Sequence, residues 1–195
     1  MQVKPIFNIN TNINQTDYYW FQEGFADQEL EWFENLKDLY SYEQASIVGS
    51  TTPNSAVRDS KIKWINLDEN SMWMYDKLMN FASEANSIWN FNLYSIVDSI
   101  QYTEYPEGCG HYDWHLDIGP GSINHRKISI VVQLSDPSEY EGGELEIWTG
   151  GQFKQIQKVK GCVVLFPSFL LHRVTPVTKG LRKSIVLWAG GDSYK

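Results

Sequence analysis

The chain has 195 residues, a formal net charge of −8 and a hydrophobic content of 42%. This size and composition predict one packed domain, and the acidic balance argues against nucleic-acid binding, which needs clustered Lys and Arg. No apolar run approaches the roughly 20 residues of a membrane helix, and no apolar signal segment follows Met1, so we expect a cytoplasmic protein without membrane attachment.

The N-terminal half begins with a polar stretch and a first helix. Residues 1–16 are rich in Asn and Thr and indicate a short edge strand or an ordered tail. Asp27 is a candidate N-cap for the helix that follows. Apolar residues then recur at helical spacing, namely Leu30, Phe33, Leu36 and Tyr40.

A loop over residues 41–60 separates this helix from a short strand, Arg58 to Ile65, and a second helix. Asp68 is the candidate N-cap of the second helix. Its apolar stripe alternates by four and three, which is the spacing of a face packed on a core: Met74, Leu78, Phe81, Ala85 and Ile88.

After Asn92 the pattern changes to short β-branched and aromatic runs with turns between them. The predicted strands cover 94–105, 126–134, 145–148, 153–159, 162–166, 170–174 and 184–188. Such a series favours a sandwich or barrel over a parallel α/β sheet. We therefore predict an α+β, mainly β, single domain over residues 1–195, with helical support at about 17–92 and a β core at about 93–190.

His115 and Asp117 are two residues apart, so on an extended segment both side chains point to one face. A distant His172 would complete a set of two histidines and one carboxylate, which is diagnostic of non-haem Fe(II) oxygenases. Alone, however, a His-x-Asp match is also typical of two polar residues on a solvated strand or turn.

Further motifs accompany His-x-Asp in a fixed order. They are Tyr105-Pro106-Glu107-Gly108, His115-Leu116-Asp117, Tyr140-Glu141-Gly142-Gly143-Glu144-Leu145, His172-Arg173-Val174-Thr175-Pro176-Val177, Gly180-Leu181-Arg182-Lys183-Ser184, and Trp188. From about Tyr94 to Trp188 this order resembles the Fe(II)/2-oxoglutarate-dependent dioxygenases, and within them the prolyl 4-hydroxylase group. The resemblance implies a double-stranded β-helix, or jelly roll, with His115, Asp117 and His172 as the iron ligands.

The same resemblance implies that Arg182 pairs with the distal carboxylate of 2-oxoglutarate, a task that suits its planar, bidentate guanidinium. Ser184, two residues on, shares that strand face and would complete the clamp. Tyr105 occupies the place of a site-lining tyrosine, although a core or rim aromatic fits equally well. Gln133 stands where many relatives carry a tyrosine that contacts the cosubstrate, and Trp188 either walls the pocket or fills the barrel.

Two other histidines carry weaker expectations. His111 is expected at the surface or behind the metal ligands, and His125 in a solvated loop that could also meet substrate.

The activity implied by the resemblance is hydroxylation of a C–H bond, with release of succinate and CO2. The expected substrate is a prolyl residue in a peptide or protein, and ascorbate is a further candidate cofactor. A free amino acid or another small molecule is an alternative substrate. A non-catalytic, cupin-like module binding zinc or manganese is the rival interpretation, but such a module has no use for the Arg182-x-Ser184 clamp.

Overall fold

The computed structural model describes residues 16–35, 39–46, 54–108 and 110–194. The edge strand or tail expected at residues 1–16 therefore lies outside the described residues, Thr16 excepted.

The helices are α1 (Asp27–Glu34), α2 (Met72–Trp89) and the 3-10 helix η2 (Gly121–His125). The strands are β1 (Tyr19–Phe21), β2 (Glu43–Gln44), β3 (Arg58–Asp59), β4 (Lys61–Ile65), β5 (Leu93–Ile96), β6 (Ile100–Pro106), β7 (His111–His115), β8 (Arg126–Gln133), β9 (Tyr140–Gly142), β10 (Leu145–Trp148), β11 (Phe153–Gln155), β12 (Val163–Pro167), β13 (His172–Val174) and β14 (Val177–Gly191).

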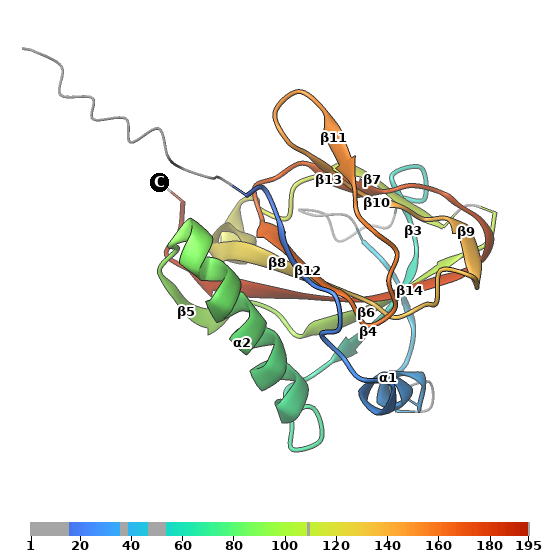
Figure 1. Cartoon of the computed structure of the whole chain (residues 1–195), viewed down its shortest axis with the longest axis horizontal. Helices are drawn as coiled ribbons and strands as arrows, with labels where there is room; N and C mark the ends of the chain where they lie inside the picture. Colours follow the sequence, from blue (N-terminus) through green and yellow to red (C-terminus); the bar gives the residue numbers. More distant parts are fainter. Residues whose placement is uncertain (1–15, 36–38, 47–53, 109, 195) are drawn as a thin grey trace, which may run out of the picture.

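The strands form two antiparallel sheets, and this confirms the predicted mainly β, jelly-roll class. The larger, nine-stranded sheet runs β1-β12-β8-β14-β6-β4-β2, with β5 and β9 paired to β14 outside this path. The five-stranded sheet runs β11-β10-β13-β7-β3. Figure 1 shows α2 lying across the larger sheet, on the side opposite β10, β11 and β13.

Two hydrophobic clusters correspond to the two faces of the larger sheet. One packs the helices onto its outer face and includes Leu78 of α2 and Leu187 of β14. The other fills part of the space between the sheets and includes Phe166 of β12 and Ile147 of β10. Because successive side chains of a strand point to opposite faces, β8 and β14 each contribute to both layers.

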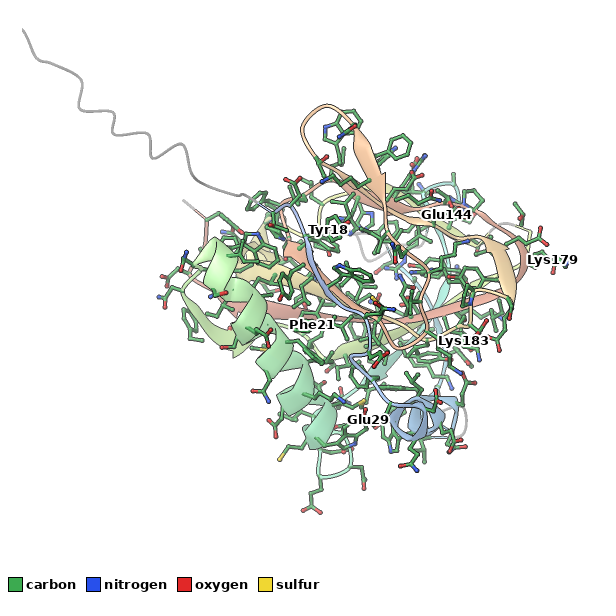
Figure 2. The ribbon with its side chains drawn as sticks, viewed as in Figure 1. Tyr18, Phe21, Glu29, Glu144, Lys179 and Lys183 are labelled. Atoms are coloured by element: carbon green, nitrogen blue, oxygen red, sulfur yellow. The ribbon has the colours of Figure 1, made fainter. Side chains whose placement is uncertain are left out.

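One ion pair joins α1 to the larger sheet and another joins the two helices; Figure 2 labels one partner of each, Lys183 and Glu29. Lys183 of β14 lies 2.7 Å from Glu34 of α1, and Lys77 of α2 lies 2.6 Å from Glu29 of α1. No helix within the described ranges is long and apolar enough to cross a membrane.

Both predicted helices exist, but their starts differ from the prediction. Ala26 is the N-cap of α1, so Asp27 is already helical, and Ser71 is the N-cap of α2. The Asp68 carboxylate instead accepts hydrogen bonds from the backbone N–H groups of Asn70 and Ser71, at 2.8 and 2.9 Å. It therefore shapes the turn before α2, because an Asp side chain can bind its own backbone two or three residues on.

The strand predictions were correct in kind and wrong in several boundaries. The run predicted at 94–105 is divided into β5 and β6, and the run at Arg58 to Ile65 is divided into β3 and β4, which enter different sheets. Conversely, the short strand predicted at 184–188 is the middle of β14, which pairs with β8 and β6 along its length. These long-range pairings extend β14 through polar residues that no local pattern marks as strand.

Candidate metal and cosubstrate site

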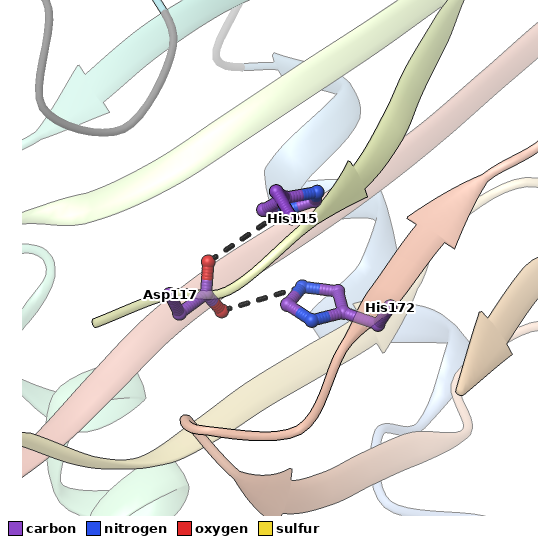
Figure 3. A group of neighbouring side chains, drawn as sticks. All are labelled: His115, Asp117 and His172. Atoms are coloured by element: carbon purple, nitrogen blue, oxygen red, sulfur yellow. Dashed lines mark ion pairs between the residues drawn. The ribbon is translucent and has the colours of Figure 1, made fainter. Parts of the chain in front are cut away.

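Strand pairing brings the predicted triad together. His115 ends β7, and His172 begins β13, directly opposite it in the antiparallel register. Directly opposed residues of neighbouring strands place their side chains on the same face. Asp117 follows two residues after His115, just beyond the end of β7, and its carboxylate faces both imidazoles (Figure 3).

Within this triad, one possible ligand atom from each residue lies within 4.8 Å of the others. Nε2 of His115 is 3.6 Å from Oδ1 of Asp117, and Nε2 of His172 is 3.5 Å from Oδ2. The Nδ1 atoms donate to backbone carbonyls, at 2.7 Å for His115 and 2.9 Å for His172. A neutral imidazole that donates through Nδ1 carries a lone pair on Nε2. Two nitrogen lone pairs and a carboxylate thus converge, which suits a cation.

The pKa values of His115 and Asp117 agree with this arrangement. Burial, reinforced by the neighbouring His172, lowers the pKa of His115 to about 3, so this imidazole is neutral at pH 7. Burial alone would raise the pKa of Asp117, but the two imidazoles, Arg126 and Ser129 outweigh it, and the pKa lies at about 2. Both residues are therefore in the state that binds a metal ion without losing a proton.

Asp117 is held by residues that the sequence analysis did not single out. Ser129 Oγ donates to Asp117 Oδ2 at 2.6 Å and lies 3.0 Å from Ser168 Oγ. Arg126 Nη1 donates to the Asp117 backbone oxygen at 3.2 Å, while the same guanidinium pairs with Asp98. The alternation of side chains along β8 indicated which way Ser129 points. Ser129 shares a strand face with Gln133, whereas the aliphatic residues that alternate with them point to the opposite face. Nothing local pointed to Arg126.

A cavity of about 250 Å³ joins the triad to Arg182. That volume is somewhat below the roughly 300–1,000 Å³ typical of small-ligand clefts. Its lining includes the triad and the predicted residues Tyr105, Arg182, Ser184 and Trp188. Arg182 is only 1% exposed. It lies directly opposite Tyr105 where β14 pairs with β6. The structure therefore brings the predicted guanidinium and the predicted metal ligands to one enclosed space.

The Arg182 guanidinium donates hydrogen bonds to two neutral groups. Nη1 donates to Ser184 Oγ at 3.3 Å, and Nη2 donates to Gln133 Oε1 at 3.1 Å. Gln133 is opposite Ser184 in the register of β8 and β14, but it does not line the cavity itself. Its observed contact is thus with the arginine.

Two buried donors in this region have no hydrogen-bond partner among the described residues, namely Arg182 Nε and Trp188 Nε1. Buried polar groups are normally paired, so unpaired ones at a cavity indicate a ligand or water. Arg182 also has no carboxylate partner among the described ion pairs. A small dicarboxylate beside a divalent cation fits this set of donors.

The remaining histidines lie apart from the triad's Nε2 atoms. His111 is half-buried at the start of β7, with Nε2 3.4 Å from the Ala56 carbonyl oxygen. His125 is not a solvated loop residue, because it is half-buried at the end of η2. Its Nδ1 lies 3.0 Å from the Gly191 carbonyl oxygen, and its Nε2 lies 3.2 Å from Ser193 Oγ. The C-terminal residues fold back over it, which the sequence pattern did not reveal.

Comparison with known sequences matches residues 100–190 to the 2OG-Fe(II) oxygenase superfamily. The chain is 29% identical over 144 residues to a PKHD-type hydroxylase of Prochlorococcus marinus, covering 74% of this chain and 62% of that protein. It is 43% identical over 107 residues to a PKHD-type hydroxylase of a Synechococcus species, covering 54% of this chain and 46% of that protein. The chain therefore spans about half to three-fifths of the length of these relatives.

Comparison with solved structures finds the same fold. A prolyl-4-hydroxylase of Pseudomonas putida superposes with a TM-score of 0.71 at 20% identity, over 91% of this chain and 94% of that chain. A prolyl hydroxylase from Trichoplax adhaerens, in complex with a hypoxia inducible factor peptide fragment, gives a TM-score of 0.70 at 18% identity, over 92% and 86%. The jelly-roll fold implied by the order of the motifs is confirmed.

Proposed function

Residues 100–190 match the 2OG-Fe(II) oxygenase superfamily, and from this match we propose that the chain is a hydroxylase of a C–H bond that uses Fe(II) and 2-oxoglutarate and releases succinate and CO2. The observation that carries the proposal is one cavity lined by both the His115, Asp117 and His172 triad and the buried Arg182. A metal-binding module without catalysis would not need the buried Arg182 beside the triad.

In this proposal, His115, Asp117 and His172 hold the iron. When bound, the iron supplies the oxygen activation and redox chemistry that no protein side chain can provide. The protein orients both imidazoles through the Nδ1 hydrogen bonds to the Asp113 and Leu170 carbonyl oxygens. Hydrogen bonds of this kind fix the tautomer and the ring orientation of a metal-binding histidine.

Arg182 would hold the distal carboxylate of 2-oxoglutarate. Ser184 and Gln133 position the guanidinium from the side, while Tyr105 lies against it, its ring centre 5.0 Å from the guanidinium carbon. Burial of this charge excludes water and strengthens a charge-assisted pair. Trp188 forms part of the wall and stacks on the Arg126 guanidinium at 3.6 Å.

For the substrate, we propose a prolyl residue in a peptide or protein. Support comes from the relatives' printed names and from the peptide in the Trichoplax neighbour. Two partly exposed apolar side chains adjoin the triad in sequence. Leu116 lies between His115 and Asp117 at 38% exposure, and Leu171 adjoins His172 at 36%.

The experiment is an assay of succinate formed from 2-oxoglutarate with Fe(II) and ascorbate, with and without proline-rich peptides. The proposal expects succinate formation that a hydroxylatable peptide stimulates, with an increase of about 16 Da in the mass of that peptide. Metal binding without any succinate would instead favour the cupin-like module. Omission of ascorbate tests its contribution separately.

A further inference from the structure

We infer that this cavity recognises a carboxylate on the substrate through Arg58, a residue that neither the motifs nor the proposed function uses. The inference rests on the proposed function, because it takes Arg182 to be engaged by 2-oxoglutarate. Arg58 lies on β3, at the edge of the five-stranded sheet, and lines the same cavity as the triad.

Within the described part of the chain, Arg58 is a buried cation held by neutral groups. The residue is 6% exposed. Nε donates to Ser60 Oγ at 2.9 Å, Nη1 to the Ser46 backbone oxygen at 3.1 Å, and Nη2 to Gln101 Oε1 at 2.8 Å. A guanidinium has five N–H donors, so two of them, one on each terminal nitrogen, have no partner among the described residues. Two such donors are what a carboxylate accepts in a bidentate pair.

The other arginines show what is missing at Arg58. Arg126 pairs with Asp98 at 2.5 Å, and Arg173 pairs with Glu146 at 2.7 Å. No ion pair between Arg58 and a carboxylate occurs among the described residues. The neighbouring stretch 47–53, outside the described residues, contains no Asp or Glu. Arg58 thus resembles Arg182, the other buried arginine for which the described residues supply no counter-ion.

The charges of the cavity lining lead to the same conclusion. Three guanidiniums line the cavity, from Arg58, Arg126 and Arg182, against two carboxylates, from Asp98 and Asp117. A divalent metal ion and the dianion 2-oxoglutarate add no net charge. One positive charge therefore remains, in a chain whose overall formal charge is −8. Because an isolated buried charge is costly, a substrate that brings one negative charge is favoured over a neutral one.

Arg58 is close enough to the triad for a substrate to meet both. Its guanidinium carbon lies 4.5 Å from the centre of the Tyr112 ring, and that ring stacks on the His115 imidazole with centres 3.4 Å apart. A carboxylate bound by Arg58 would therefore fix the substrate beside the metal ligands. This contact would orient the reacting C–H bond, as substrate-positioning arginines do. The carboxylate could be a terminal one or that of an acidic side chain in a peptide.

The test is a binding measurement on the full chain loaded with Mn(II) and saturated with N-oxalylglycine, an unreactive analogue of 2-oxoglutarate. Two matched pairs of probes are titrated by calorimetry: N-acetyl-L-proline against its amide, and acetyl-Gly-Pro-Asp-amide against acetyl-Gly-Pro-Asn-amide. The first pair presents a terminal carboxylate and the second a side-chain one. We expect the acid of at least one pair to bind roughly 10- to 100-fold more tightly than its amide.

In Arg58→Gln the acid should bind no better than its amide, while N-oxalylglycine affinity changes less than about twofold, since Arg182 remains. Arg58→Lys keeps the positive charge but loses the planar guanidinium that can bind a carboxylate through two hydrogen bonds. This variant should retain part of the preference for the acid over its amide. Arg173→Gln, a guanidinium outside the cavity, should leave both affinities unchanged.

Equal binding of acid and amide in both pairs by the wild-type protein would overturn the inference, and this comparison needs no variant. A preference that survives in Arg58→Gln would overturn it as well. Failure of the wild-type protein to bind N-oxalylglycine would contradict the proposed function itself. This binding is measured before any acid or amide probe is added, so the two failures can be distinguished.

Discussion

The two faces of the sheet formed by β8 and β14 differ sharply in chemistry although they share one backbone. The face toward α2 carries only aliphatic side chains at its centre. Ile130 and Val132 of β8 and Ile185 and Leu187 of β14 are all 0% exposed there. This face can therefore contribute apolar burial, which is the main favourable contribution to folding.

The opposite face, toward the five-stranded sheet, carries polar side chains that are just as deeply buried. Ser129 and Gln133 of β8 and Arg182 and Ser184 of β14 are at most 3% exposed. Buried polar groups stabilise a fold only when they are paired, and here they pair with one another and with Asp117. Strand alternation thus separates the layer that stabilises the fold from the layer that carries the site, and changes on the two faces should have different effects.

The largest effect is expected for Asp117→Ala, on the polar side. Loss of a group that merely orients a ligand lowers metal affinity by about 10- to 100-fold, so loss of the carboxylate should exceed this and abolish succinate formation. Calorimetric titration with Mn(II) and the succinate assay measure the two effects. Asp113→Ala, which removes an exposed carboxylate four residues earlier, is the matched control. Full turnover in Asp117→Ala would refute the ligand assignment.

On the apolar side, Leu78→Ala should mainly affect stability. Leu78 lies on α2 and is 0% exposed, so the free energy of unfolding should fall by about 2–5 kcal/mol. Urea unfolding measures this loss. The KM for 2-oxoglutarate should stay unchanged in the folded variant. Leu67→Ala, at a site 56% exposed, should cost less than about 0.5 kcal/mol. A changed KM in Leu78→Ala would show that the two faces are coupled.

Arg182→Ala should have the converse pattern, with a raised KM for 2-oxoglutarate. Hydrogen bonds to charged groups contribute about 1.5–3 kcal/mol, which corresponds to roughly a 10- to 100-fold rise. Steady-state succinate formation at varied 2-oxoglutarate concentration measures it. Arg173→Ala, which loses a guanidinium paired with Glu146 outside the cavity, should leave the KM unchanged. An unchanged KM in Arg182→Ala would remove the cosubstrate assignment.

The smallest effect is expected from the pH dependence of stability of the metal-free protein. The pKa of His115 is lowered from 6.5 to about 3, so below pH 6.5 the unfolded chain binds a proton that the folded protein does not. The contribution of His115 to the free energy of unfolding should therefore be fully present above pH 6.5 and should decrease as the pH drops toward 3.

Between about pH 7.5 and pH 5.0 this single site accounts for about 1–2 kcal/mol. Urea unfolding at both pH values, for the wild-type protein and His115→Gln, isolates the contribution, since other titrating groups are common to both. A wild-type slope no steeper than that of His115→Gln would contradict the lowered pKa. Asp117 acts in the same direction at lower pH, because its pKa falls from 3.8 to about 2.

Local pattern alone determined much of this protein. Helical spacing identified the α1 and α2 faces through Leu30 and Leu78, and turn residues separated the strands of the β body. The order of the motifs, through its resemblance to a known family, predicted His115, Asp117, His172 and Arg182 as a metal and cosubstrate set, and these residues do line one cavity.

The partners of those residues were decided only by tertiary structure. Ser129, Arg126 and Arg58 are separated from Asp117 and His115 by stretches with no distinguishing pattern, and only the pairing of β8, β7 and β3 with their neighbours brings them close. The same holds for Gln133, which faces Arg182 through the register of β8 against β14. Side-chain type and spacing are local properties of a sequence, whereas register between distant strands depends on which faces can be buried together.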